Sequence, residues 1–258
     1  MDRIESIALD LKKAEASRNP IGAISKRFPD LAIEDAYRIQ LLNIDAELKA
    51  GRTITGKKIG LTSLAMQNML GVNQPDFGHL LDSMEVAGGE VSRSTMIQPK
   101  VEGEIAFVLK GDLKGPNVTA KEVLEATDYV VASIEIVDSR VEDWKINIVD
   151  TVADNASSCM YAISSRRIDP NLVDLKKVKM EFFKNGEKIN EGVGTDVLGD
   201  PANCVAWLAN TLGDFGVQLK KGDLILSGAF TAALDADAGD VFRASFTELG
   251  DIEVKFTE

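Results

Sequence analysis

The sequence contains a single histidine, His79, and only two cysteines, Cys159 and Cys204, among its 258 residues. One histidine excludes a histidine-rich metal site and argues against a histidine-based nucleophilic triad. The two cysteines have neither the spacing of a zinc site nor that of a redox pair. We therefore expect both to be reduced packing residues in a cytoplasmic protein.

Long apolar runs and positive charge are also scarce. No apolar run reaches the roughly 18 residues that a membrane span requires, and the first residues, MDRIESIALDLKKAEASR, are too charged for a signal peptide. The 29 Lys and Arg are outnumbered by 41 Asp and Glu, and the resulting net charge of −12 disfavours nucleic acid and anionic membranes as partners. With 45% apolar residues, the composition is that of a globular protein with one large domain, with or without a small appendage.

Two carboxylates stand out in the segment QPKVEGEIAFV, where β-branched and aromatic residues recur at period two and predict a strand over 101–109. Glu102 and Glu104 would then point to the same face, with Cα atoms roughly 6.6 Å apart. Like charges at this spacing repel each other, and a divalent cation between them would remove the conflict. The alternative is a strand end that emerges into solvent, where carboxylates cost little.

A third carboxylate, Glu135, lies in the otherwise apolar run YVVASIEIV of residues 129–137. Burying an ionised carboxylate is expensive unless it is paired or bound to a metal. A salt bridge to a nearby base such as Arg140 would satisfy it. If Glu135 instead joins Glu102 and Glu104, the three form an oxygen-rich half-shell suited to Mg²⁺ or Mn²⁺.

The chain changes character near residue 52. Residues 1–50 predict helices, with an Asp2–Glu5 capping box at the first and a second helix from about Glu34 to Lys49 that ends at Gly51. Strands dominate after Thr53. We therefore predict an α+β fold in which a small helical N-terminal part, residues 1–52, precedes a mixed β-sheet rolled into a sandwich or barrel, residues 53–258.

Several further elements are predicted from local signals. Asn185-Gly186 favours a type I′ turn, and Asp200-Pro201 is typical of a helix start. The full set comprises a helical turn at 65–70, a helix at 117–126, a loop at 143–158, a hairpin at 178–192, a helix from 201 through 212, and strands at 223–227, 241–246 and 252–256.

Lysines and an aspartate near the start of the β-rich part are further candidates. Lys57 and Lys58 lie between Gly56 and Gly60, and such glycines indicate a bulge or a close backbone approach to a ligand. A lysine pointing inward would have its pKa lowered by burial and could transfer protons, whereas two solvated edge lysines are an equally good interpretation. Asp76 would lie in a Pro/Gly loop, and we expect the adjacent His79 to be structural or at the surface.

Long blocks of the chain resemble a known family: GKKIGLTS, QNMLGVNQPDFG, IQPKVEGEIAFVLK, DWKINIVDTVADNAS and NCVAWLANTLG. They are similar to the 2-hydroxypenta-2,4-dienoate hydratases (2-oxopent-4-enoate hydratases) of catechol meta-cleavage pathways. That group belongs, with the 4-oxalocrotonate decarboxylases, to the fumarylacetoacetase-like superfamily. The resemblance covers nearly the whole chain and implies a fumarylacetoacetase-like mixed β-roll core with an Mg²⁺ or Mn²⁺ site.

The resemblance also implies roles for particular residues. Glu102, Glu104 and Glu135 would be the metal ligands, Lys58 the active-site lysine, and Asp76 a loop residue closing over the substrate. The residues implied near the substrate are Asn155, Ser158, Ser227, Gly228 and Arg140. Ala229 follows Ser227-Gly228 where many relatives are expected to carry Ser or Thr, so contacts there would come from backbone amides.

The implied reaction is the hydration of a short 2-hydroxy-dienoate to 4-hydroxy-2-oxopentanoate. The nearest alternative is decarboxylation of 4-oxalocrotonate on the same fold and cation. A superfamily C–C hydrolase fits less well, because it depends on a His–Glu pair, and a non-catalytic scaffolding subunit is a further alternative. The resemblance implies a homo-oligomer and an association with the decarboxylase.

Overall fold

The structure of the protein is a computed structural model that describes residues 2–63, 67, 72 and 74–258. Apart from Gln67, the helical turn expected at 65–70 therefore lies outside the described residues. No helix within these ranges combines the length and the apolar character needed to cross a membrane.

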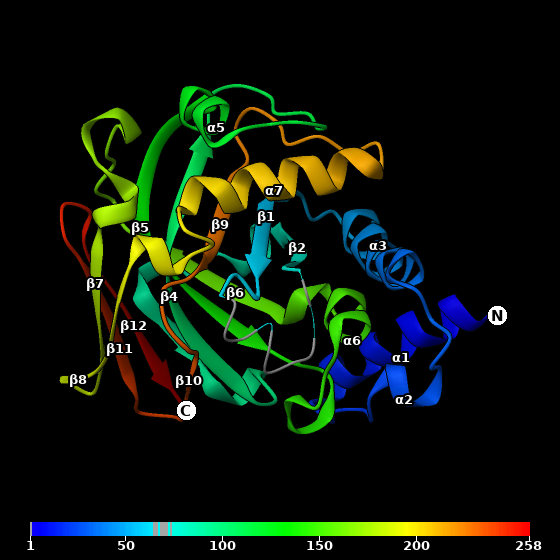
Figure 1. Cartoon of the computed structure of the whole chain (residues 1–258). Helices are drawn as coiled ribbons and strands as arrows, with labels where there is room; N and C mark the ends of the chain where they lie inside the picture. The colour runs from blue at the N-terminus through cyan, green and yellow to red at the C-terminus, as the bar shows by residue number, and fades with distance from the viewer. Residues whose placement is uncertain (1, 64–66, 68–71, 73) are drawn as a thin grey trace.

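Helices α1 (Arg3–Ser17), α2 (Ile24–Arg27) and α3 (Ile33–Lys49) form the N-terminal part, on the right in Figure 1. The predicted capping box is present: the Asp2 side chain accepts a hydrogen bond from the Glu5 amide, and the Glu5 carboxylate accepts one from the Asp2 amide. Gly51, with φ 94°, follows the end of α3, as expected for a left-handed helix stop. Buried apolar residues of α1 and α3 belong to the same hydrophobic core as the sheets.

The remaining chain forms two sheets, which confirms the predicted α+β fold with a mixed β-core. The strand order is β2-β1-β9-β4-β5-β6 in the first sheet, where β10 also pairs with β4, and β3-β12-β11-β7-β8 in the second. The strands are β1 (Ile54–Gly60), β2 (Asp76–Leu81), β3 (Glu90–Ser92), β4 (Pro99–Leu109), β5 (Thr127–Asp138), β6 (Ser158–Ile163), β7 (Lys179–Lys184), β8 (Glu187–Val193), β9 (Leu224–Ala229), β10 (Leu234–Asp235), β11 (Val241–Phe246) and β12 (Gly250–Thr257).

The second sheet buries one face and exposes the other, as the alternating pattern of 252–256 predicts. On β12, Ile252, Val254 and Phe256 are buried, whereas Glu253 and Lys255 are exposed. The β7–β8 hairpin turns at Asn185 and Gly186, whose φ values of 54° and 83° are those of the predicted type I′ turn.

The described residues include three further α-helices: α5 (Ala120–Ala126), α6 (Ile148–Ala153) and α7 (Pro201–Asp214). The helix predicted at 117–126 begins only after its Thr119 cap, and α7 begins at the predicted Asp200 cap. The loop predicted over 143–158 was wrong, because Asn147 caps α6 there by accepting from the Val149 and Asp150 amides. Strands β3, β6 and β10 were not predicted.

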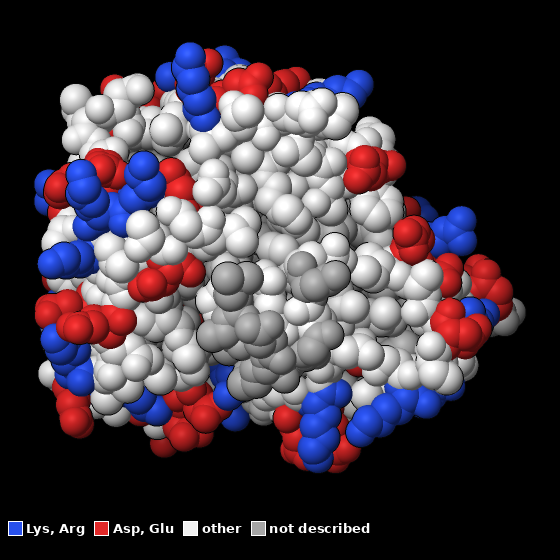
Figure 2. Space-filling view, in the orientation of Figure 1, with Lys and Arg blue, Asp and Glu red and all other residues white. Residues whose placement is uncertain are grey.

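Helix α7 runs across the front of the first sheet in Figure 1, and the N-terminal helices and α6 lie at its side. Figure 2 shows acidic and basic side chains interspersed around the margin of this face, whereas the area over α7 is largely uncharged. This face therefore carries no basic stripe of the kind that nucleic-acid binding requires.

Candidate active site

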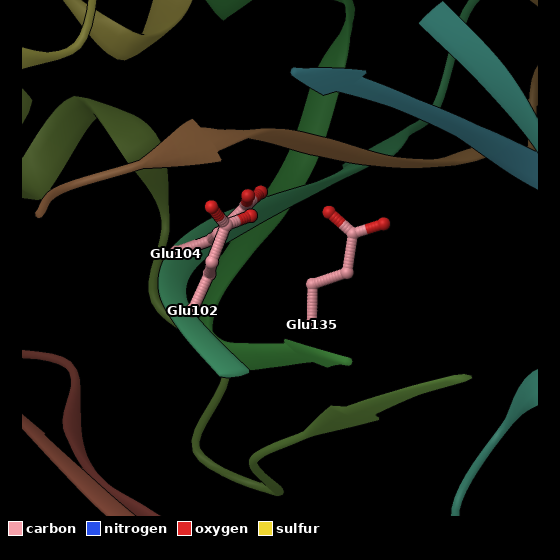
Figure 3. Close-up of side chains that lie close together, drawn as sticks. All are labelled: Glu102, Glu104 and Glu135. Atoms are coloured by element: carbon pink, nitrogen blue, oxygen red, sulfur yellow. The ribbon is translucent and has the colours of Figure 1, made fainter. Parts of the chain in front are cut away.

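Three glutamates converge on one face of the first sheet (Figure 3). Glu102 on β4 is paired directly with Glu135 on β5, and Glu104 follows Glu102 on the same face of β4. Each residue offers a carboxylate oxygen, and these oxygens lie within 4.8 Å of one another. The three side chains therefore converge, as predicted. Alternation along β4 places Glu102 and Glu104 on the same face, and the pairing of β4 with β5 places Glu135 beside Glu102 on that face.

The cluster is electrostatically unfavourable without a cation. Burial raises the pKa of all three carboxyls, that of Glu135 to about 8, and repulsion from its neighbours adds to the effect at Glu104. Glu104 Oε2 accepts a hydrogen bond from the Gly228 amide at 2.9 Å, but Glu104 Oε1 and both Glu135 oxygens have no hydrogen-bond partner among the described residues. Buried acceptors without donors are costly, so these oxygens have lone pairs available for a ligand.

The donor set fits a hard divalent cation. Mg²⁺ prefers hard oxygen ligands such as carboxylates. Glu102, Glu104 and Glu135 would each offer it one carboxylate oxygen. Mn²⁺ accepts the same oxygen donors.

Lys58 contributes the positive charge at the cluster. Its Nζ lies 3.3 Å from Glu135 Oε2 and donates to the Ala156 carbonyl at 3.0 Å. The partner of Glu135 is thus Lys58, not Arg140. Burial lowers the pKa of Lys58, but the surrounding carboxylates, Glu135 foremost, outweigh this and shift it upward. The carboxylates therefore oppose the lowering of the pKa expected from burial and favour the ammonium form of Lys58.

The two lysines point away from each other, and both are buried, which excludes the solvated edge interpretation. Gly56 and Gly60 are required because other atoms of the protein, rather than a ligand, lie close to their backbone. A Cβ on Gly56 would lie 1.8 Å from the Leu224 carbonyl oxygen, and a Cβ on Gly60 would lie 2.3 Å from Asp76 Oδ1.

Asp76 lies beside Lys58, although not in a loop. It is the first residue of β2 and is buried, so the prediction that it lies in a loop was wrong. Asp76 Oδ2 accepts a hydrogen bond from the Thr151 hydroxyl of α6, and Oδ1 has no hydrogen-bond partner in the described part of the chain. Thr151 was not predicted as a site residue, because α6 was predicted as loop. The Asn147–Asp150 capping pattern was the signal that could have revealed the helix.

Three of the residues predicted to lie near the substrate, Asn155, Ser158 and Arg140, make their hydrogen bonds with other parts of the protein. The Asn155 side chain bonds the backbone of His79, and the Arg140 guanidinium bonds Asp154 and the carbonyls of Asp138 and Ser158. With Ser158 they line a cavity of about 340 Å³ against α1 and α3, whose lining does not include the three glutamates. Substrate contact by these residues stays a prediction.

Strand β9, which pairs with β4, brings Ser227 and Gly228 close to the three glutamates. The Ser227 hydroxyl is fully buried and donates to the Ile105 carbonyl, whereas the Gly228 amide reaches Glu104. A Cβ on Gly228 would lie 2.4 Å from the Thr62 side chain, and its φ is +107°. Glycine is required there because the backbone must approach both Glu104 and Thr62.

His79 is structural, as expected. It is buried, and its Nδ1 lies 2.8 Å from Gln40 Oε1. Both cysteines are free, and Cys204 is buried in α7.

Comparison with known proteins places these features in context. The family described as Fumarylacetoacetate (FAA) hydrolase C-terminal matches residues 70–257. The chain is 45% identical over 258 residues to 2-hydroxyhexa-2,4-dienoate hydratase from Comamonas testosteroni, covering 99% of this chain and 98% of that protein. It is 45% identical to 2-keto-4-pentenoate hydratase from Paraburkholderia xenovorans, covering 98% and 94%. The solved 4-oxalocrotonate decarboxylase from Pseudomonas putida G7, complexed with magnesium and adipate, is 37% identical with a TM-score of 0.94, covering 98% and 97%.

Proposed function

The chain belongs to the fumarylacetoacetate hydrolase family, and we propose that it is a metal-dependent hydro-lyase that converts 2-hydroxypenta-2,4-dienoate to 4-hydroxy-2-oxopentanoate. The proposal rests on similarity to hydratases over nearly the full chain. The structural observation that supports metal-dependent chemistry is the cluster of Glu102, Glu104 and Glu135. Three buried carboxylate oxygens of Glu104 and Glu135 accept no hydrogen bond from the described residues. The reaction belongs to the meta-cleavage breakdown of aromatic compounds.

We propose Mg²⁺ or Mn²⁺ as the resident cation, held by the three glutamates. A bound cation supplies Lewis acidity toward the carboxylate and C2 oxygens of an α-keto acid. The glutamates present their oxygens on one face of the sheet, and Gly228 fixes one oxygen of Glu104. Lys58 offsets part of their charge through Glu135.

The remaining groups fit the proton movements of this hydration. In the reaction C5 of the dienoate gains a proton while the 2-hydroxyl loses one, which gives a 2-oxo-3-enoate. Water then adds across C3 and C4: its oxygen bonds to C4 and gives up one proton, and C3 gains a proton. Lys58, whose ammonium form the surrounding carboxylates favour, is suited to donate a proton or to polarise an oxygen. Asp76 Oδ1 is buried without a donor and is suited to accept a proton from the attacking water. Lys58 and Asp76 are the proposed catalytic residues.

Decarboxylation of 4-oxalocrotonate is the second candidate, because the decarboxylase shares this fold. Its substrate has a second carboxylate, which a cationic side chain would recognise. Among the described residues, Lys58 is the one base in ion-pair contact with the glutamates, and residues 59–81 contain no Lys or Arg. The similarity to named hydratases over nearly the full chain favours the dienoate.

The sequence resemblance also supports a homo-oligomer, an association with the decarboxylase and a cytoplasmic location. Size-exclusion chromatography of the protein alone, and of its mixture with a purified 4-oxalocrotonate decarboxylase, tests the first two.

The test of the proposed function is an ultraviolet assay with freshly generated 2-hydroxypenta-2,4-dienoate, with 4-oxalocrotonate as the competing substrate. We expect the dienoate absorbance to disappear with Mg²⁺ or Mn²⁺ and to persist after chelation. Release of carbon dioxide from 4-oxalocrotonate, with the dienoate untouched, would favour the decarboxylase. No turnover of either substrate with Mn²⁺ would leave a scaffolding role.

A further inference from the structure

Strand β2 is the edge of the first sheet, and it carries Asp76 at its start. One side of β2 pairs with β1, where Gly78 lies opposite Lys58. The other side turns the backbone groups of Phe77 and His79 outward, where no further strand of the described chain covers them. Unpaired backbone groups at a buried edge require other partners.

Asn155 supplies those partners at His79. Its Oδ1 accepts from the His79 amide at 2.7 Å, and its Nδ2 donates to the His79 carbonyl at 2.9 Å. One carboxamide thus reproduces both hydrogen bonds that a neighbouring antiparallel strand would make with this residue.

Gln40 extends the same edge from α3. Its Nε2 donates to the Phe77 carbonyl at 3.1 Å and to the Val152 carbonyl of α6 at 2.8 Å. Its Oε1 lies 2.8 Å from His79 Nδ1. Because an amide oxygen can only accept a hydrogen bond, we assign the imidazole proton to Nδ1. Gln40 is 1% exposed, and all these bonds are inside the protein.

The turn that carries Asn155 has an unusual backbone. Asn155, Ala156 and Ser157 have φ values of 54°, 50° and 53°, three successive left-handed residues of which none is glycine. Such residues are strained, and they persist only where their surroundings hold them. The Ser157 amide and hydroxyl both donate to Asp154, at 2.9 and 3.2 Å.

This conformation points the Ala156 carbonyl at Lys58 Nζ, 3.0 Å away. The turn also lies close against β2, because a Cβ on Gly78 would be 2.3 Å from the Asn155 carbonyl oxygen. The position of β2 and the position of the turn are therefore not independent of each other.

We propose that Asn155 and Gln40 are positioning residues that clamp the outer edge of β2. These hydrogen bonds from Asn155 and Gln40 to β2, which we call the clamp, fix the positions of Asp76 and of the Ala156 carbonyl relative to Lys58. Asn155 thus acts on the protein and not on the substrate. The inference rests on the proposed function, in which Lys58 and Asp76 handle the proton movements.

The test compares Asn155→Gly with Asn117→Ala in the metal-loaded enzyme. Glycine adopts the left-handed turn without strain, so Asn155→Gly removes the carboxamide alone. Asn117 is exposed and has φ 69°, so Asn117→Ala introduces left-handed strain at a position that makes none of these contacts. Gln40→Met is a second variant of the clamp that keeps the side-chain length.

We expect both clamp variants to lose about 10- to 100-fold in kcat, with KM and Mn²⁺ affinity within about twofold of wild type. Hydrogen exchange of the 76–81 amides should become faster in both. Asn117→Ala should keep wild-type kcat and exchange in 76–81.

A KM raised about tenfold with kcat retained would overturn the proposal by placing Asn155 on the substrate. A lowered melting temperature with unchanged kcat in both clamp variants would also overturn it, leaving a purely structural role. If wild type itself does not hydrate the dienoate, the proposed function fails separately. In that case unchanged exchange in 76–81 would still contradict the clamp, and faster exchange would support it.

Discussion

Glu102 and Glu135 are directly opposed residues of the antiparallel pair β4 and β5. Directly opposed side chains have Cβ atoms about 4.5–5.5 Å apart, and like charges in that position destabilise a sheet. Glu104 adds a third carboxylate on the same face, and the single ammonium of Lys58 does not neutralise three carboxylates. This arrangement costs stability unless a cation occupies it.

Neutralising one of these carboxylates should therefore stabilise the metal-free protein. Glu104→Gln keeps an oxygen for the Gly228 amide and removes one negative charge. We expect the free energy of unfolding without metal to rise by on the order of 1 kcal/mol, about 2–4 °C in melting temperature for a chain of this size. The gain in melting temperature on adding Mg²⁺ should shrink. Calorimetry with and without chelator measures both.

The matched control is Glu253→Gln, which changes an exposed glutamate on β12. It should leave both melting temperatures within about 1 °C of wild type, because exposed charges contribute little. A Glu104→Gln variant that is destabilised without metal would contradict the like-charge interpretation of the cluster.

Lys58 and Lys57 allow a comparison within one strand. Lys58→Met should lower kcat by at least about 100-fold, since it removes the ammonium beside Glu135, while Mn²⁺ still binds. Lys57 is buried as well, but its side chain points to the other face, and Lys57→Met should retain turnover. Steady-state kinetics and calorimetric Mn²⁺ titration of both variants decide the matter. Full activity of Lys58→Met would remove this lysine from the mechanism.

Thr151 orients Asp76 through a hydroxyl hydrogen bond. Thr151→Val is nearly isosteric and frees the second carboxylate oxygen, so we expect kcat to fall about tenfold with KM nearly unchanged. Thr127→Val is the control, because Thr127 is also buried and donates to the Val123 carbonyl away from the glutamates. It should lose about 1 kcal/mol of stability and no kcat. If Thr151→Val and Thr127→Val have the same kcat, Thr151 has no role in catalysis.

His79 should not titrate in the physiological range. Burial, together with the charge of Lys57, lowers the pKa of His79 to about 3. A base with a lowered pKa stays neutral in the fold but gains a proton in the unfolded chain below about pH 6.5, so it reduces stability as the pH falls from about 6.5 toward 3. Because His79 is the single histidine, its imidazole proton resonance can be followed alone in tag-free protein. We expect no shift between pH 5 and 8, and a midpoint near 6.5 would mean that His79 is not buried in solution.

The sequence predicted the cluster of glutamates because each step followed from local periodicity. Alternation placed Glu102 and Glu104 on one face, and the cost of burying Glu135 in an apolar strand indicated a partner for it. The pairing of β4 with β5 at the required register is a long-range contact that alternation does not specify, and there the family resemblance supplied the expectation. The domain division at residue 52 stays a prediction.

The errors arose where long-range packing decides the outcome. Residues 143–158 were predicted as loop because polar residues dominate, although Asn147 and Asp150 cap a short helix. The pKa of Lys58 was predicted from burial alone, and the carboxylates from three other strands reversed the sign. Gln40 was not predicted at all, since nothing in an amphipathic helix distinguishes a buried glutamine that bonds a strand edge.

The most direct test of the central claim is a calorimetric titration of chelator-treated protein with Mn²⁺, followed by the dienoate assay on the same samples. We predict one ion per chain in the wild type, hydratase activity that rises in proportion to the ion bound, and loss of both in the double variant Glu104→Gln/Glu135→Gln. Wild-type affinity in that double variant, or full turnover by the metal-free wild type, would contradict the account.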